Sequence, residues 1–130
     1  MSAAEAKPSA LQVEAISMGE SVWSGQSFLV IAQIVNKGKT DETLKVSNCF
    51  REANWVLEPA SLRFEKFPCN STLEESLVLK PGESRAEKIS VIVPETFVGK
   101  LRFRLGFKIP DTAEMIWSSY LKVETRKPRI

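Results

Sequence analysis

Sixteen acidic residues and two cysteines are the side chains that could support catalytic or metal-binding chemistry in this chain, because histidine is absent. Without histidine there is no imidazole to activate a serine or cysteine and no imidazole ligand for a metal ion. Glu74 and Glu75 form the only adjacent pair of glutamates, and neighbouring residues of a strand point to opposite faces, so they cannot flank one substrate. We therefore expect a protein that is not an enzyme, with no catalytic residues, no metal site and no cofactor.

The other acidic residues and the serines form no catalytic pattern in the sequence either. Glu58, Glu65 and Glu83 stand singly at expected strand edges or turns. Ser118 and Ser119 have no base to activate them, and a Gly-x-Ser-x-Gly motif is absent. The six glycines are scattered singly among the turns, which argues against a phosphate-binding loop.

The charge pattern predicts neither a nucleic-acid partner nor insertion into a membrane. The net charge is +2, and the two signs are interspersed along most of the chain. The one basic cluster is Arg126-Lys127-Pro128-Arg129, which we interpret as a solvated tail, with contact to nucleic acid or a membrane surface as the alternative. No apolar run approaches the roughly 20 residues that cross a bilayer.

Cys49 and Cys69 are separated by 20 positions in an irregular part of the sequence. A disulfide between them would stabilise the fold by roughly 3 kcal/mol on the chain-entropy model. The alternative is two free thiols in a cytosolic protein. A tetrahedral metal site does not fit, because two thiolates without histidine or a Cys-x-x-Cys spacing cannot complete the ligand set.

The cysteines and the amino terminus together predict an extracytoplasmic protein that is periplasmic, secreted or on the cell surface. Disulfides persist mainly in oxidising compartments. Residues 1–10 are small, polar and alanine-rich, as expected just after a signal-peptide cleavage site. A native cytoplasmic start is the alternative interpretation of the same residues.

Three tryptophans are candidates for stacking against a ligand such as a sugar. Trp23 lies in an expected turn and Trp55 in the irregular middle segment, so both are predicted to be exposed and able to contact a ligand. Trp117 alternates in phase with Leu121 and Val123, which predicts a core position for it.

The apolar residues recur with a period of two along most of the chain, which predicts β-strands. Residues 28–35 are an almost unbroken apolar run, typical of a central strand. In the segment 101–108, four apolar side chains face one way, while Arg102, Arg104 and Lys108 form a cationic stripe on the other. We interpret this stripe as a solvated outer face, with binding of an acidic partner as the alternative.

Seven to nine short strands with turn signals about every eight to twelve residues predict an all-β fold, namely one antiparallel β-sandwich. The predicted organisation is a flexible amino-terminal segment at 1–10, the sandwich at 11–124 and a basic carboxy-terminal tail at 125–130.

Three short motifs resemble those of bacterial immunoglobulin-like modules. They are the Val35-Asn36-Lys37-Gly38 turn after an apolar strand, the Leu79–Ser84 segment with its Pro-Gly-Glu turn, and the Val-x-Val-Pro strand that follows. Over residues 11–124 the chain resembles the cell-adhesion-related (CARDB) and fibronectin-type modules of uncharacterised extracytoplasmic proteins. The resemblance implies an immunoglobulin-like fold with a role in adhesion, assembly or presentation on the cell surface.

A second resemblance is to β-sandwich proteinase inhibitors, on the turn at Asn36, the pair Asn54-Trp55 and the turn Pro81-Gly82-Glu83. It would imply inhibition through the loops 19–25 or 53–59. The expected function is therefore a non-enzymatic module that binds or scaffolds a protein or surface partner. The alternatives are a proteinase inhibitor and a carbohydrate-binding module.

Overall fold

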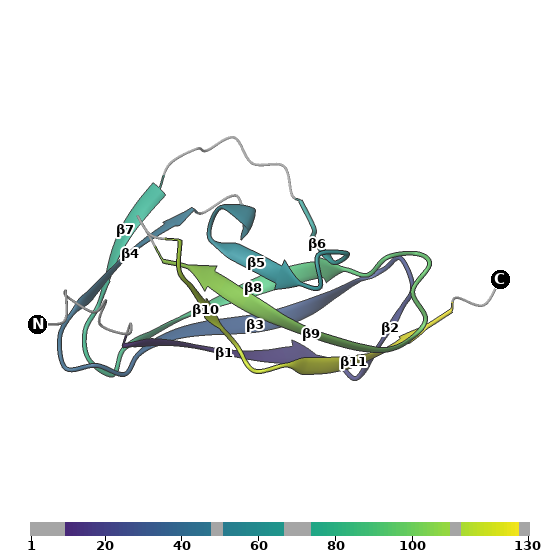
Figure 1. Cartoon of the computed structure of the whole chain (residues 1–130), viewed down its shortest axis with the longest axis horizontal. Helices are drawn as coiled ribbons and strands as arrows, with labels where there is room; N and C mark the ends of the chain where they lie inside the picture. The colour runs from purple at the N-terminus through teal and green to yellow at the C-terminus, as the bar shows by residue number, and fades with distance from the viewer. Residues whose placement is uncertain (1–9, 48–50, 67–73, 110–112, 128–130) are drawn as a thin grey trace, which may run out of the picture.

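The computed structural model describes residues 10–47, 51–66, 74–109 and 113–127, and these residues form an all-β fold with one short 3-10 helix (Figure 1). The elements are β1 (Leu11–Met18), β2 (Ser21–Trp23), β3 (Ser27–Asn36), β4 (Glu42–Ser47), η1 (Arg51–Ala53), β5 (Trp55–Glu58), β6 (Arg63–Phe64), β7 (Glu74–Leu79), β8 (Ser84–Ile92), β9 (Gly99–Lys108), β10 (Met115–Trp117) and β11 (Leu121–Arg126). The all-β prediction is confirmed.

One sheet has the strand order β1-β3-β8-β6, and all its neighbours are antiparallel. β3 lies inside this sheet, as its apolar run predicts. The side chains of Phe28, Val30, Ala32 and Ile34 are buried on its inner face, and the residues between them are half-buried on the outer face. The β-branched residues that dominate β3 suit such a pleated surface.

The second sheet is built around β9, which pairs with β5, β10 and β11. The predicted apolar face of β9 is confirmed, because Leu101, Phe103, Leu105 and Phe107 are each at most 3% exposed. β2 joins the far side of β11 as a parallel neighbour, which departs from the purely antiparallel prediction.

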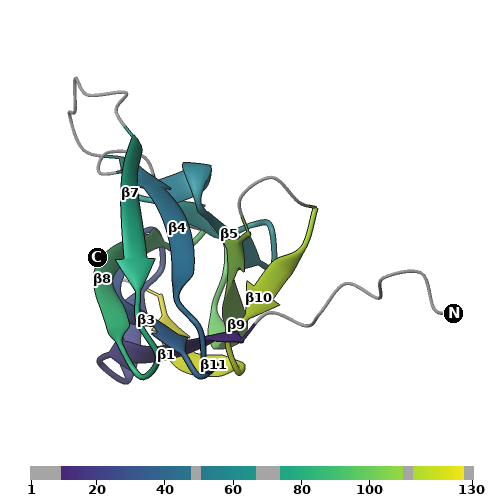
Figure 2. The ribbon, with the colours of Figure 1, turned by 90° about the vertical axis from the view of Figure 1, so that its left-hand side faces the viewer.

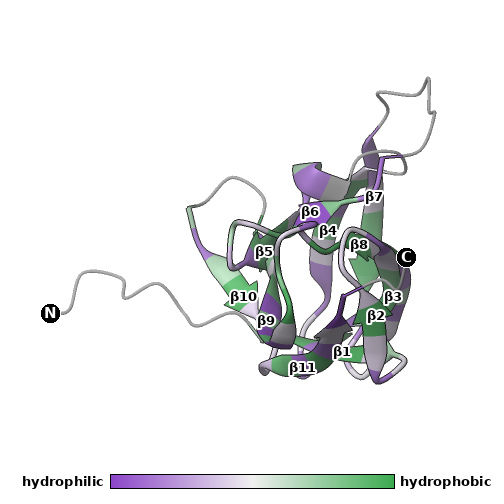
Figure 3. Ribbon diagram, turned by 90° about the vertical axis from the view of Figure 1, so that its right-hand side faces the viewer, coloured by the Kyte–Doolittle hydropathy of each residue, from purple (hydrophilic) through white to green (hydrophobic). Residues whose placement is uncertain are grey.

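The two sheets enclose one hydrophobic core. Figure 2 shows β3 and β8 on one side and β5, β9 and β10 on the other, with β4 in front of the space between them. Phe28 of the first sheet meets Phe103 of the second edge to face, with ring centroids 5.3 Å apart. In Figure 3 the strands change colour along their length, because hydrophobic and hydrophilic residues alternate between the core and the solvent.

β4 and β7 form a separate two-stranded sheet that continues the β3–β8 pair beyond a corner. Asn36, which is fully buried, stabilises this corner. Its Nδ2 donates to the carbonyl groups of Thr40 and Leu79, each at 2.9 Å, and its Oδ1 accepts from the amide of Gly38. A buried amide with all these partners fixes the bend by hydrogen bonding.

The structure differs from the sequence predictions in two further respects. The described residues contain eleven strands where seven to nine were expected, and β11 continues to Arg126, two residues past the predicted end of the sandwich. Cys49 and Cys69, the predicted disulfide partners, lie outside the described residues. No helix in the described ranges is long and apolar enough to cross a membrane.

Candidate functional site

A β-bulge separates β10 from β11 and sets the geometry of the candidate site. Trp117 lies opposite Gly106 and Leu121 lies opposite Phe103, so one strand has three residues between these pairs where β9 has two. Ser118 stabilises the bulge, because its amide donates to the Leu105 carbonyl at 2.8 Å and its Oγ accepts from the Leu105 amide at 3.1 Å.

The extra residue reverses which side chains face the core. Leu121 and Val123 face inward, but Ile116 rather than Trp117 packs against the core from β10. The predicted core position of Trp117 is therefore wrong, because strict alternation does not hold across a bulge. Trp117 lies half-buried on the outer face of the second sheet.

Four outer-face side chains form a stacked series that we call the ladder: Trp117, Arg104, Tyr120 and Arg102. The guanidinium carbon of Arg104 lies 4.1 Å from the ring centroid of Trp117 and 4.9 Å from that of Tyr120. The guanidinium carbon of Arg102 lies 4.0 Å from the centroid of Tyr120. Each distance is well inside the range of cation–π attraction.

Glu58, on β5, holds the centre of the ladder. Its two carboxylate oxygens accept from Nε and Nη2 of Arg104 at 3.0 and 3.1 Å, a bidentate pair. The hydroxyl of Tyr120 donates to Glu58 Oε1 at 2.7 Å. The Arg104 hydrogen bonds, followed by that of Tyr120, hold the pKa of Glu58 below its ordinary value. The same contacts with Glu58 raise the pKa values of Arg104 and Tyr120.

Gly106 leaves room for the Trp117 ring on the outer face of β9. A Cβ atom at position 106 would lie 2.9 Å from two carbon atoms of that ring. Since real Cβ contacts this short essentially never occur, any larger residue at position 106 must displace the indole. The ladder therefore depends on a glycine directly opposite the tryptophan.

We expect the ladder to weaken in acid because of Glu58. A carboxylate whose pKa is lower in the folded than in the unfolded protein contributes stability above its unfolded pKa and loses it as the pH falls through the folded value. Urea unfolding measured from neutral to acidic pH should show a steeper loss of stability in the wild type than in Glu58→Gln. Equal pH dependence of the two proteins would contradict this expectation.

Trp23 and Trp55, the two tryptophans predicted to contact a ligand, differ in their exposure. Trp55 is 1% exposed, and its indole Nε1 donates to Glu87 Oε2 at 2.8 Å, so its predicted exposure is wrong. Trp23 is 47% exposed, as predicted, and its contact with a ligand stays a prediction. A sugar-binding platform that includes Trp55 is therefore not formed. The exposure of Trp55 was predicted from the irregular segment before it. Trp55 instead begins the buried strand β5.

The segments proposed as inhibitory loops also differ from expectation. Residues 19–25 contain β2, which pairs with β11, and residues 53–59 contain all of β5, which pairs with β9. Their backbones take part in sheet pairing, whereas a free loop would present its backbone to a protease.

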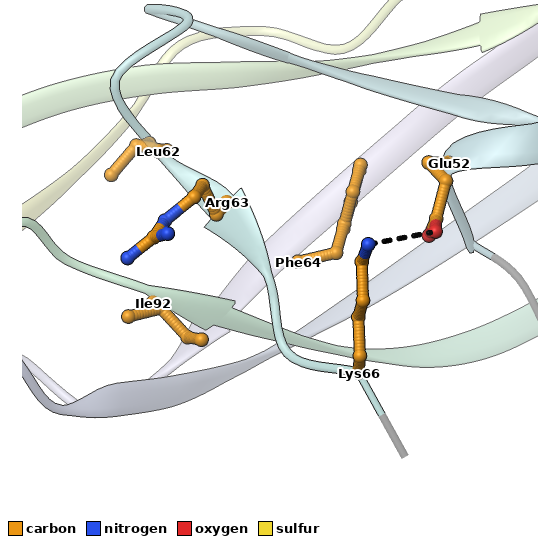
Figure 4. Close-up of a pocket in the computed structure, with 6 residues that line it drawn as sticks. All are labelled: Glu52, Leu62, Arg63, Phe64, Lys66 and Ile92. Atoms are coloured by element: carbon orange, nitrogen blue, oxygen red, sulfur yellow. Dashed lines mark ion pairs between the residues drawn. The ribbon is translucent and has the colours of Figure 1, made fainter. Parts of the chain in front are cut away.

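A recess of about 570 Å³ lies beside β6 on the edge of the first sheet (Figure 4). Leu62, Phe64 and Ile92 supply its apolar lining. Lys66 and Glu52 lie on the other side as an exposed ion pair with 4.0 Å between Nζ and Oε1. This recess holds no buried polar side chain that would orient a ligand, and among the described residues no group of three or more potential metal ligands is found.

The sequence did not predict Glu58 as the glutamate partner of the ladder, because Glu58 is distant in the chain from the residues that it contacts. Glu58 stands 46 positions from Arg104 and 62 from Tyr120. One local signal was available: Trp55 and Leu57 alternate with Val56 and Glu58, which places Glu58 on the outer face of a strand.

The comparisons with known proteins identify a similar fold. No protein-family model and no curated protein sequence matches the chain. Among solved structures, a FixG-related protein from Vibrio parahaemolyticus is similar with a TM-score of 0.56 and 7% sequence identity, over 91% of this chain and 98% of that one. Spo0M, a sporulation control protein from Bacillus subtilis, is similar with a TM-score of 0.56 and 13% identity, over 93% of this chain and 51% of that one. The chain thus spans about half the length of the Spo0M chain, and at these identities the likeness concerns the fold alone.

Proposed function

We propose that this protein is a non-enzymatic, immunoglobulin-like binding module, and that it contacts a protein partner through the outer face of β9, β10 and β11. The observation that carries the proposal is the ladder, in which a bulge turns Trp117 and Tyr120 outward around Arg104. Aromatic residues, methionine and arginine are the residue types enriched in protein interfaces.

The strand orders support the immunoglobulin-like part of the proposal. In that fold, the first, second, fifth and fourth strands form one sheet, and the third, sixth and seventh form the other. β1-β3-β8-β6 corresponds to the first set. β5, β9 and the bulged pair β10–β11 correspond to the second, with β4 and β7 as an added ribbon.

The exposure of the ladder's neighbourhood supports its use as an interaction surface. Tyr120 is 41% exposed, and Met115, two positions before Trp117 on β10, is 38% exposed. The ladder is already stacked and tied to Glu58 in the free protein. Because its side chains are held in place before binding, a partner would lose less side-chain entropy in ordering them.

An extracytoplasmic location is part of the same proposal and rests on the pair Cys49 and Cys69 in the sequence. Titration of free thiols in denaturant without reductant would test it. The expected result is no titratable thiol, and two titratable thiols would contradict the disulfide.

The function is tested by affinity capture from an extract of the source organism with quantitative mass spectrometry. Three baits are compared: the wild type, a ladder variant with Trp117→Ala and Tyr120→Ala, and a control with Ile16→Ser and Met18→Ser. Ile16 and Met18 are 59% and 52% exposed on β1 of the opposite sheet, so the control also changes two large surface residues.

We expect the wild type and the β1 control to recover a partner protein that the ladder variant does not recover. Retention by the ladder variant together with loss by the control would contradict the proposed surface. Circular dichroism of all three baits establishes that the loss of a partner does not reflect unfolding.

A further inference from the structure

Arg102 and Arg104 lie on the same face of β9 but differ in their hydrogen bonding. Arg104 directs two of its nitrogen atoms to the carboxylate of Glu58. Arg102 is held only by stacking on the ring of Tyr120 at 4.0 Å, and it forms no hydrogen bond or ion pair with the part of the chain that the structure describes. Its planar fork of donors is therefore oriented but unused.

Lys122 adds a second cation directly beside Arg102. The two residues are opposite one another in the antiparallel register of β9 and β11, and both are exposed. Like charges placed directly opposite on a sheet are destabilising. Within the described ranges, Lys122 also has no carboxylate within ion-pair distance, so no direct ion pair offsets this repulsion.

These two residues border a recess of about 400 Å³, which is also lined by Lys100, Glu20 and Glu124. Three cations and two carboxylates leave a local net charge of one positive unit. A single carboxylate would balance this charge. A dianionic phosphate would exceed it and would be repelled by the two glutamates already present.

We propose that this recess binds a glutamate or aspartate side chain of the protein partner, with Arg102 as the bidentate donor and Lys122 as the second cation. The inference rests on the proposed function, because it names the partner chemistry of the same surface. Tyr120 positions Arg102, and Glu58 positions Tyr120 through the 2.7 Å hydrogen bond to its hydroxyl. The guanidinium is thereby preorganised for a planar carboxylate.

The test is titration of the ¹⁵N-labelled protein with blocked tetraglutamate, tetraglutamine and phosphoserine peptides, followed at the Arg102 Nε–H resonance. The tetraglutamate peptide should bind saturably and more weakly at high salt, and tetraglutamine should not bind. Arg102→Gln should weaken binding about tenfold, the expected effect of losing a charge-assisted pair. Lys108→Gln is the matched control, since Lys108 lies on the same strand outside the recess and donates to the Glu52 carbonyl.

Equal binding of tetraglutamine, or unchanged binding by Arg102→Gln, would overturn the carboxylate site, and tighter binding of the phosphoserine peptide would replace it by a phosphate site. The carboxylate site and the proposed function can also be tested separately. A captured partner that depends on Trp117 and Tyr120 but tolerates Arg102→Gln would support the surface and reject the carboxylate. Peptide binding without any ladder-dependent partner would reject the proposed function.

Discussion

Replacing Glu87 with leucine is expected to lower the free energy of unfolding by about 3 kcal/mol, the scale found when one member of a buried ion pair is removed. Glu87 lies on the core-facing side of β8 and is 7% exposed. Its Oε2 accepts from the Trp55 indole at 2.8 Å, and its Oε1 lies 3.5 Å from Nε of Arg85. Leucine would leave the buried indole donor without an acceptor and Arg85 without its counter-charge.

Two comparison variants separate the hydrogen bond from the charge. Glu87→Gln keeps an acceptor for the indole and should cost about 1 kcal/mol. Trp55→Phe removes the donor, so Glu87→Leu should cost less in that background than in the wild type. Urea unfolding of the wild type, the three single variants and the double variant measures these differences. If Glu87→Leu is as stable as the wild type, Glu87 does not stabilise Trp55 in the core.

The sequence predicts the sheets well where a strand is regular. Along β9 the apolar residues alternate without interruption from Leu101 to Phe107, and their inward direction follows directly from the two-residue period of a strand. The central place of β3 is likewise predictable, because few polar residues interrupt its apolar run.

The candidate site is harder to predict, because it depends on one extra residue and on contacts between distant strands. A single bulge residue between Trp117 and Leu121 reverses which side chains of the following strand face the core. Nothing in the Trp-Ser-Ser-Tyr segment shows where the alternation breaks. The buried indole of Trp55 donates to Glu87, a residue 32 positions away on another sheet. Local periodicity carries no information about such a partner.

The ladder also shows why an arginine stripe on a strand need not be an ordinary solvated surface. Arg104 is half-buried, with 26% of its side chain exposed, because Trp117 and Tyr120 both contact its guanidinium and Glu58 accepts from its donor edge. Arg102 is one strand period away and has only Tyr120. The same residue type thus has a structural role at one position and an available donor edge at the next.

Replacing Gly106 with valine is expected to break the ladder by displacing the Trp117 ring, at a cost of about 1 to 3 kcal/mol in the free energy of unfolding. The new Cβ would lie 2.9 Å from two ring carbons, and the indole cannot keep both this position and its stacking on Arg104. Gly106 does not have a positive φ angle, so the backbone itself accepts valine without strain.

A double-mutant cycle with Trp117→Ala isolates the steric effect from any change in β-propensity. With the indole removed, Gly106→Val should be neutral or stabilising, because valine is favoured over glycine in a strand. The difference between the two costs is the coupling between positions 106 and 117, measured by urea unfolding. An equal cost in both backgrounds would mean that the ring does not occupy the space above Gly106. In that case the stacking of Trp117 on Arg104, and with it the proposed interaction surface, would not require a glycine at position 106. The bulge alone would then have to account for the outward position of Trp117.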